Sequence, residues 1–215
     1  MKTAHSRSGF TLIELTIVAA ILSVVLASVG MFQSRNQDFY RQESALSDAQ
    51  GRTHRALERV MSELDGLGLT TITPDPTSSV GSDTITFQRS TGVNGSGTRI
   101  WSTQIRIALA LDEGEADNGL DDDGDGLVDE RRIVVTYNFG TASARALTIV
   151  HDVPELHPDE LANASDDNGN GIVDEKGFNV QRVGNLLTVR LAVQAHGADG
   201  QIVSWAESSG TRIRN

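Results

Sequence analysis

The sequence predicts an α+β protein in which one long N-terminal helix, transmembrane in its first half, packs on an antiparallel β-sheet head with two inserted acidic loops. Three observations predict this class. The chain opens with an uninterrupted apolar run, continues with a polar segment of helical period, and ends in alternating segments joined by irregular connections. The expected divisions are a leader at residues 1–9, a membrane half of the helix at 10–32, a stalk half at 33–67 and a head at 68–215.

The charge of the chain is unevenly distributed. The 215 residues carry a formal net charge of −11 and include no cysteine, which excludes a disulfide framework, a thiolate metal site and a cysteine nucleophile. Ten acids lie between Asp112 and Glu130 and eight between Asp152 and Glu175, with no lysine or arginine in either block. The rest of the chain holds 11 acids and 18 bases. An acidic chain binds phosphates poorly, so no nucleic-acid partner is expected.

The first apolar run is long enough to cross a membrane. Residues 10–32 are 23 residues with one ionisable side chain, that of Glu14. As a helix they span roughly 34 Å, which exceeds a bilayer core of about 30 Å. Lys2 and Arg7 precede the run, and the positive-inside rule keeps this leader cytoplasmic and sends the rest of the chain outward. Composition alone would also fit a simple anchor helix.

The start of this run resembles a known processing signal. Gly9 stands directly before the run, and Glu14 within it costs up to about 2.5–3.5 kcal/mol in lipid unless it has a partner. The segment Ser8–Leu15, SGFTLIEL, resembles the motif of type IV prepilins and of the pseudopilins of type II secretion. The resemblance implies that prepilin peptidase cuts between Gly9 and Phe10 and methylates the new amine of Phe10. It also implies that Glu14 neutralises the N-terminal amine of a neighbouring subunit during assembly.

The same resemblance implies a pilin-like fold and a set of partners. The protein would sit in the inner membrane with a periplasmic head, contact an assembly platform there, and join other pilin or pseudopilin subunits through its N-terminal helix. Three weaker likenesses favour minor pilins and pseudopilins of the J/W-like group. They lie at residues 41–64, 134–137 and 211–215.

After Phe32 the sequence is polar but keeps a helical period to about Asp65, and glycines then end the helix. The apolar positions are Phe39, Leu46, Ala49, Thr53, Ala56, Leu57, Val60, Met61 and Leu64. Their spacing does not hold the heptad of a coiled-coil arm, which is the alternative. The charged side chains expected to form a solvated face are Glu58, Arg59, Glu63 and Asp65.

The head is expected to be built from short strands. Alternating or β-branched segments predict strands at residues 84–88, 100–111, 133–139, 146–150 and 186–195, with a weaker candidate at 202–206. Residues 92–97, GVNGSG, are expected to be a flexible connection.

The two acidic loops, expected at residues 112–130 and 159–177, contain a repeat. Residues 121–130, DDDGDGLVDE, align with residues 166–175, DDNGNGIVDE, at an offset of 45, and Asn118 aligns with Asn163. Oxygen-bearing side chains at the first, third and fifth positions, followed by glycine at the sixth, form the front half of an EF-hand-type loop. Because these ligands are hard oxygens, the repeat predicts two Ca²⁺ sites rather than transition-metal sites.

The proposed ligands of the first site are Asp121, Asp123, Asp125, the carbonyl of Leu127, Asp129 and Glu130. Those of the second are Asp166, Asn168, Asn170, the carbonyl of Ile172, Asp174 and Glu175. Val128 and Val173 are expected to enter the core. The twelfth position holds Arg132 or Gly177 in place of a glutamate, so a true EF-hand is rejected. The alternative is a pair of solvated acidic turns.

The first site should bind Ca²⁺ more strongly, because Asn168 and Asn170 replace two carboxylates in the second. Binding would order both loops and stabilise the head. The histidines after residue 32 are scattered along the chain and lie at no metal-binding spacing: His54, His151, His157 and His196. No enzyme is expected. The leading hypothesis is a structural minor pilin or pseudopilin, and the alternative is a calcium-dependent filament-tip adhesin or ligand-binding pilin.

Overall fold

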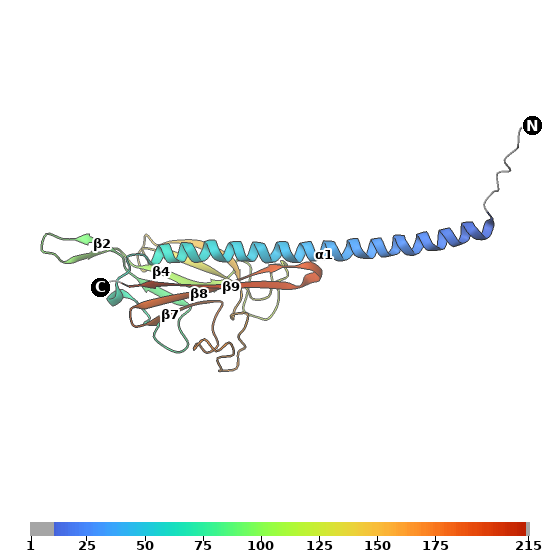
Figure 1. The fold of residues 1–215 in the computed structure, drawn as a ribbon. Coiled ribbons are helices and arrows are strands. Elements are labelled where there is room, and N and C mark those ends of the chain that lie inside the picture. The colour runs from blue at the N-terminus through green and yellow to red at the C-terminus, as the bar shows by residue number, and fades with distance from the viewer. Residues whose placement is uncertain (1–10, 214–215) are drawn as a thin grey trace, which may run out of the picture. The chain divides into compact units, whose positions relative to one another are not determined.

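The computed structural model describes residues 11–213, apart from the side chain of Asp199. The chain divides into two compact units between Arg41 and Gln42. Figure 1 shows the helix α1 (Leu12–Leu64), which begins in the first unit and ends in the second. The expected leader, Gly9 and Phe10 lie outside the described residues.

The described part of the first unit is the apolar start of α1. Its large apolar side chains are exposed along the whole stretch from Leu12 to Phe32. An 18-residue window in this helix has a mean hydropathy of 2.5, and none of that window is buried. By length and composition α1 can therefore cross a membrane, as the sequence predicts.

The part of α1 in the second unit packs against the strands. Its buried residues are mostly small or apolar and recur at helical spacing: Ala45, Ala49, Thr53, Ala56, Leu57, Val60, Glu63 and Leu64. The hydroxyl of Thr53 donates to the carbonyl oxygen of Ala49 at 2.8 Å, which satisfies it inside the core. This face meets the sheets, so the predicted helix-on-sheet arrangement is confirmed.

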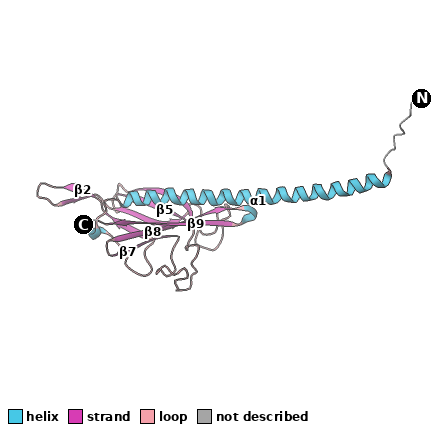
Figure 2. Cartoon of the chain, in the orientation of Figure 1, coloured by secondary structure: helices cyan, strands magenta, loops and turns pink. Residues whose placement is uncertain are grey.

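Two larger sheets and one hairpin form the rest of the second unit, and all their pairings are antiparallel. Figure 2 shows the strands in magenta beside the helix. The four-stranded sheet has the order β1 (Thr84–Phe87), β4 (Ile105–Leu111), β5 (Arg131–Tyr137), β6 (Arg145–Val153). The three-stranded sheet has the order β7 (Phe178–Val183), β8 (Leu186–His196), β9 (Ile202–Arg212). The hairpin joins β2 (Ser90–Val93) and β3 (Arg99–Trp101), and two short 3₁₀ helices cover Leu69–Thr71 and Ala198–Gly200.

The structure has strands in every region where the sequence predicts one, but it has more strands than predicted. The strand expected at residues 100–111 is two strands, β3 and β4, because the chain leaves one sheet and enters another between them. The supposed flexible connection at residues 92–97 is the tip of the β2–β3 hairpin. Strand β7 was not expected, and β9 continues to Arg212.

One core joins the helix to both larger sheets. It includes Leu57 and Val60 from α1, Phe87 from β1, Ile133 from β5 and Leu191 from β8. Because the core is continuous, the loops that leave the two sheets start from a rigid base.

A buried carboxylate lies at the end of α1, where the sequence predicted a solvated face. Glu63 is only 4% exposed. Its Oε1 lies 2.6 Å from an Nη of Arg59 and accepts a 2.6 Å hydrogen bond from the hydroxyl of Tyr137, while Arg89 donates to Oε2. The prediction for Glu63 was wrong because these three partners, two of them on strands or in loops distant in sequence, compensate the buried charge.

Candidate functional sites in the N-terminal segment and the acidic loops

The first acidic loop joins two neighbouring strands of the four-stranded sheet, and the second crosses from that sheet to the three-stranded sheet. The first connects β4 to β5, and the second connects β6 to β7. The amide of Asp112 donates to the carbonyl oxygen of Glu130 at 3.1 Å, and the amide of His157 donates to that of Glu175 at 2.8 Å. Both hydrogen bonds close a loop base at the same offset of 45 residues, so the repeat covers residues 112–130 and 157–175.

The aspartate at the first position organises each loop. In the first loop Asp121 accepts from the amides of Gly124 at 2.7 Å and Gly126 at 2.9 Å. In the second, Asp166 accepts from the amides of Gly169 and Gly171, both at 2.7 Å. Each loop is therefore wound around its first carboxylate.

The side chains at the third and fifth positions of each loop also accept hydrogen bonds from the backbone, each from the amide two residues later. Asp123 accepts from the amide of Asp125 at 3.0 Å, and Asp125 accepts from that of Leu127 at 2.8 Å. The asparagines of the second loop do the same: Asn168 accepts from the amide of Asn170 at 3.0 Å, and Asn170 from that of Ile172 at 2.9 Å.

The backbone angles of the loops match as well. Gly124 and Gly126 have φ values of 81° and 91°, and Gly169 and Gly171 have values of 74° and 89°. Glycine at these positions enters the left-handed region without the strain of a Cβ. The two loops therefore share one backbone conformation, which their sequence repeat indicated.

The ninth-position aspartates hold the backbone upstream of them. Asp129 accepts from the amides of Asn118 at 2.8 Å and Gly119 at 2.7 Å. Asp174 accepts from the amides of Asn163 and Ala164, both at 3.0 Å. Their carboxylates thus have a role in fixing the loop itself, beside the ligand role that the sequence predicted.

The tenth-position glutamates are buried carboxylates with a free oxygen. Glu130 is 1% exposed and Glu175 is fully buried. Oε2 of Glu130 and Oε1 of Glu175 have no hydrogen-bond partner. Burial raises the pKa of Glu130 to about 7, and the neighbouring carboxylates of Asp125, Glu115 and Asp123 add to that shift. Buried unpaired carboxylate oxygens are unusual and need a functional or structural reason.

The sequence reasoning missed a further glutamate in each loop. The carboxylate of Glu115 accepts from the amide of Asp123 at 3.1 Å, and that of Glu160 accepts from the amide of Asn168 at 3.2 Å. Glu160 is 5% exposed, and its Oε2 has no partner. Extending the alignment upstream at the same offset of 45 pairs Glu115 with Glu160, so the signal was present in the sequence.

In the first loop these side chains come close enough to share a cation. One group of carboxylates within 4.8 Å of one another comprises Asp121, Asp123 and Asp125, and a second comprises Glu115, Asp123 and Glu130. Asp123 belongs to both. The donors are all hard oxygens, which is the ligand set that Ca²⁺ prefers.

The hydrophobic position of each loop was predicted one residue too late. Val128 is 51% exposed and Val173 is half-buried, whereas Leu127 is 2% exposed and Ile172 is fully buried. The chain turns directly after each valine, where Asp129 and Asp174 have left-handed φ values of 50° and 48°. Both loops run directly into strands, and no helix follows either of them.

Glu14 lies at the start of α1 as half of a capping pair. Its Oε2 accepts from the amide of Thr11 at 2.9 Å and from its hydroxyl at 3.0 Å. In return the hydroxyl of Thr11 accepts from the amide of Glu14 at 3.3 Å. This reciprocal arrangement is a capping box, which the spacing Thr-x-x-Glu also encodes.

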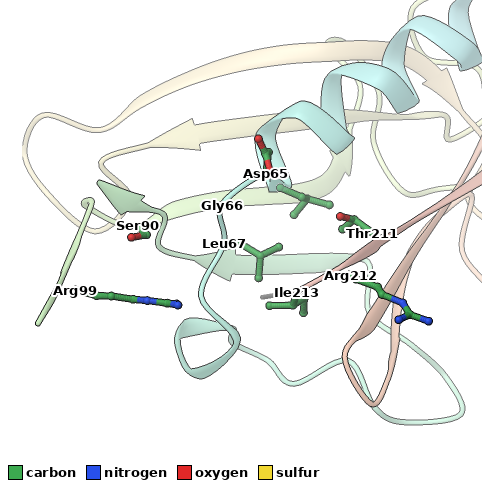
Figure 3. A pocket seen from close by; sticks show the side chains of 9 residues that line it. Asp65, Gly66, Leu67, Ser90, Arg99, Thr211, Arg212 and Ile213 are labelled. Atoms are coloured by element: carbon green, nitrogen blue, oxygen red, sulfur yellow. The ribbon is translucent and has the colours of Figure 1, made fainter. Parts of the chain in front are cut away.

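A shallow pocket lies where α1 ends. Figure 3 shows side chains from the end of the helix, the β2–β3 hairpin and β9 around a cavity of about 520 Å³. Its lining mixes apolar Leu64, Leu67 and Ile213 with the charged Asp65 and Arg99. These residue types supply no nucleophile paired with a base, and the pocket is separate from the acidic loops.

Comparison with known proteins identifies the N-terminal segment. Residues 4–30 match the family model of the prokaryotic N-terminal methylation motif. Searches of curated proteins and of solved structures find no match to this chain. The motif supports a type IV prepilin-like or pseudopilin protein, and with the long apolar helix it fits a membrane-anchored pilin. It also implies processing by prepilin peptidase and assembly with other pilin subunits.

Proposed function

We propose that this protein is a structural minor pilin or pseudopilin whose head is stabilised by Ca²⁺. Prepilin peptidase cuts between Gly9 and Phe10 and methylates the new N-terminus, and the mature subunit joins a type IV pilus-like or type II secretion filament. The methylation motif at residues 4–30, followed by the exposed apolar start of α1, carries this proposal. The protein needs no catalytic group for this role.

The apolar start of α1 would serve both membrane insertion and assembly. Before assembly the exposed side chains between Leu12 and Phe32 are solvated by lipid, with Lys2 and Arg7 on the cytoplasmic side and the head in the periplasm. In a filament the same side chains pack against those of neighbouring subunits. Glu14 then exchanges its capping contacts with Thr11 for the amine of a neighbour, which keeps its charge compensated.

Support for calcium comes from two independent features of the loops. One is the convergence of carboxylates in the first loop, and the other is the pair of buried glutamates, Glu130 and Glu175, each with an oxygen that lacks a hydrogen-bond partner. A divalent cation would satisfy these oxygens and remove the repulsion among the carboxylates. The residues that would hold it in the first loop are Asp121, Asp123, Asp125, Glu115 and Glu130.

Processing can be tested with the full-length chain co-expressed with a prepilin peptidase. Mass spectrometry should show loss of residues 1–9 and the gain of one methyl group on Phe10. The variant Gly9→Val should remain full length, while Gly30→Val, a matched change within α1 and away from the cleavage site, should be processed normally. An unprocessed wild-type chain would contradict the proposal.

Assembly is tested separately with Glu14→Ala. We expect the processed chain to stay in the membrane fraction but to be lost from sheared filaments, because the amine of Phe10 loses its partner. Glu58→Ala, which removes a carboxylate from an exposed position of the same helix, is the matched control and should assemble. Intact filaments that lose only attachment to a surface would favour the adhesin instead.

A further inference from the structure

We infer that the guanidinium of Arg190 takes the place of a cation in the second acidic loop. As a result, the first loop binds Ca²⁺ before the second loop does. This inference rests on the proposed calcium function and specifies which loop binds first and which residue sets the order. It goes beyond the substitution of asparagines for aspartates, because Arg190 lies outside both loops, on β8.

Arg190 contacts the buried glutamate of the second loop. Its Nε lies 3.6 Å from Oε1 of Glu175, and the arginine side chain is 19% exposed. Arg190 also lines a hollow of about 280 Å³ together with Asn168 and Asn170, two of the expected ligands. A permanently charged guanidinium therefore shares the space that a cation at this loop would use.

The other oxygen of Glu175 is also engaged. The side-chain amide of Asn170 donates to Oε2 at 2.6 Å. With a guanidinium 3.6 Å from Oε1 and an amide on Oε2, the charge of Glu175 is balanced without an ion, although Oε1 still accepts no hydrogen bond. Without Arg190 and Asn170, Glu175 would be a buried charge with no partner. These two residues therefore stabilise the second loop when no ion is bound.

The first loop has no such compensation among the described residues. The charged groups that act on Glu130 are the carboxylates of Asp125, Glu115 and Asp123. The neighbouring arginines pair with other carboxylates: Arg132 pairs with Glu113, and Arg131 lies 3.6 Å from Asp117. Strand β8 reaches this loop too, but with His196, whose ring packs so close that a Cβ on Gly126 would lie 2.6 Å from its Cε1.

The two loops thus differ strongly in charge while sharing a backbone. The first brings together five carboxylates, from Asp121, Asp123, Asp125, Glu115 and Glu130. At the matching positions the second holds three, from Asp166, Glu160 and Glu175, beside the positive charge of Arg190. The carboxylates of Asp159 and Glu207 line the same hollow as Arg190 but lie outside these matching positions. Because calcium affinity follows the charge of the ligand set, the first loop fills first, and an ion enters the second only against the guanidinium.

The experiment measures Ca²⁺ binding by isothermal titration calorimetry on the purified full-length chain in detergent, after removal of bound ions with a chelator. The wild-type chain should show one tight site and a second at least about tenfold weaker. Arg190→Gln should tighten the second site about tenfold or more, as expected for removing one unit charge a few ångströms from the ion. Arg190→Lys keeps the charge and should leave the second site weak.

A matched control is Arg212→Gln on β9, which causes the same change in net charge at an exposed position away from the loops. It should leave both sites unchanged. The second loop can be measured alone by repeating the Arg190 series in an Asp123→Ala/Asp125→Ala background, where the first loop lacks two ligands. Thermal melts with and without Ca²⁺ show whether each variant is folded.

The outcomes separate this inference from the calcium proposal. Two sites of equal affinity in the wild-type chain, or a second site that does not tighten in Arg190→Gln, would overturn the role of Arg190 and leave calcium binding intact. Binding only in Arg190→Gln would support the role of Arg190 and remove the first loop as a site. No binding in any folded variant would overturn both.

Discussion

The two acidic loops have the same backbone conformation, but the buried glutamate of each loop has different charged neighbours. Hydrogen bonds, left-handed residues and closing contacts recur at an offset of 45 residues. Glu130 is nevertheless surrounded by carboxylates, whereas Glu175 lies beside Arg190. The comparison teaches that a repeated motif fixes the backbone conformation, while residues outside the motif change the charge around the buried glutamate.

The largest expected effect is the response of the whole protein to calcium. At a free Ca²⁺ concentration a hundred times the dissociation constant of the tight site, binding should stabilise the folded chain by about 3 kcal/mol. For a protein of this size this raises the melting temperature by about 6–10 °C. Differential scanning calorimetry of the full-length chain in detergent, with Ca²⁺ or with chelator, measures it.

The comparison predicts that most of the stabilisation by Ca²⁺ comes from the first loop. Asp123→Ala in the first loop should abolish most of it, because Asp123 belongs to both carboxylate groups. Asn168→Ala, the matched change in the second loop, should leave most of it in place. Equal losses in the two variants would show that the loops contribute alike, and melting temperatures unaffected by Ca²⁺ would contradict the proposed calcium function.

The next largest effect is an opposite response of the two buried glutamates. In chelator at pH 8, Glu130→Gln should stabilise the chain by roughly 1–3 kcal/mol, because a buried carboxylate with a pKa of about 7 is ionised there at a cost. Glu175→Gln should destabilise it by roughly 1–3 kcal/mol, because the charge of Arg190 loses its partner. Chemical denaturation in chelator measures both.

Calcium provides the second half of this test. Glu130→Gln should lose the stabilisation by Ca²⁺ that the wild-type chain shows, so that its advantage disappears when the ion is present. If both substitutions change stability in the same direction in chelator, then the charge surrounding the two glutamates does not differ in effect, and the comparison fails.

The sequence alone predicts the two loops and the long helix, because each depends on a local pattern of residues. The repeat at residues 121–130 and 166–175 and the apolar N-terminal helix are contiguous signals, and both loops and the helix were placed from them. Glu115 and Glu160 lie at the same offset further upstream, so the repeat in the sequence encodes this pair as well.

The features that the sequence could not supply come from pairings between distant residues. Arg190 reaches the second loop because β8 pairs with β7, which follows that loop. Glu63 is buried because Arg89 and Tyr137 meet it at the end of α1. Strand β7 includes the buried polar residue Asn179, whose side-chain amide donates to the carbonyl oxygen of Val80, a residue distant in sequence. No local periodicity encodes these contacts.

A smaller effect, equal in the two loops, is expected where their roles are the same. Asp129→Asn and Asp174→Asn each weaken two hydrogen bonds from backbone amides, since a neutral amide oxygen is a weaker acceptor than a carboxylate. Each should cost about 1 kcal/mol in chelator, measured by denaturation. Unequal costs would mean that the second loop is held mainly by Arg190 rather than by its own backbone contacts.

The smallest effect concerns the one position at which the matching backbones carry different residues in a left-handed conformation. Gly119 has a φ of 77°, and its counterpart Ala164 has a φ of 60°. An alanine pays a steric cost there that glycine does not. Ala164→Gly should therefore stabilise the chain slightly, by about 0.5–1 kcal/mol, less the entropy that glycine adds to the unfolded state, and Gly119→Ala should destabilise it by a similar amount. Neither residue supplies a side-chain ligand, so Ca²⁺ affinity should stay constant in both variants. A change of affinity in Gly119→Ala alone would show that the first loop must adjust its backbone to bind the ion, whereas unchanged affinity in both would leave charge as the difference between the loops.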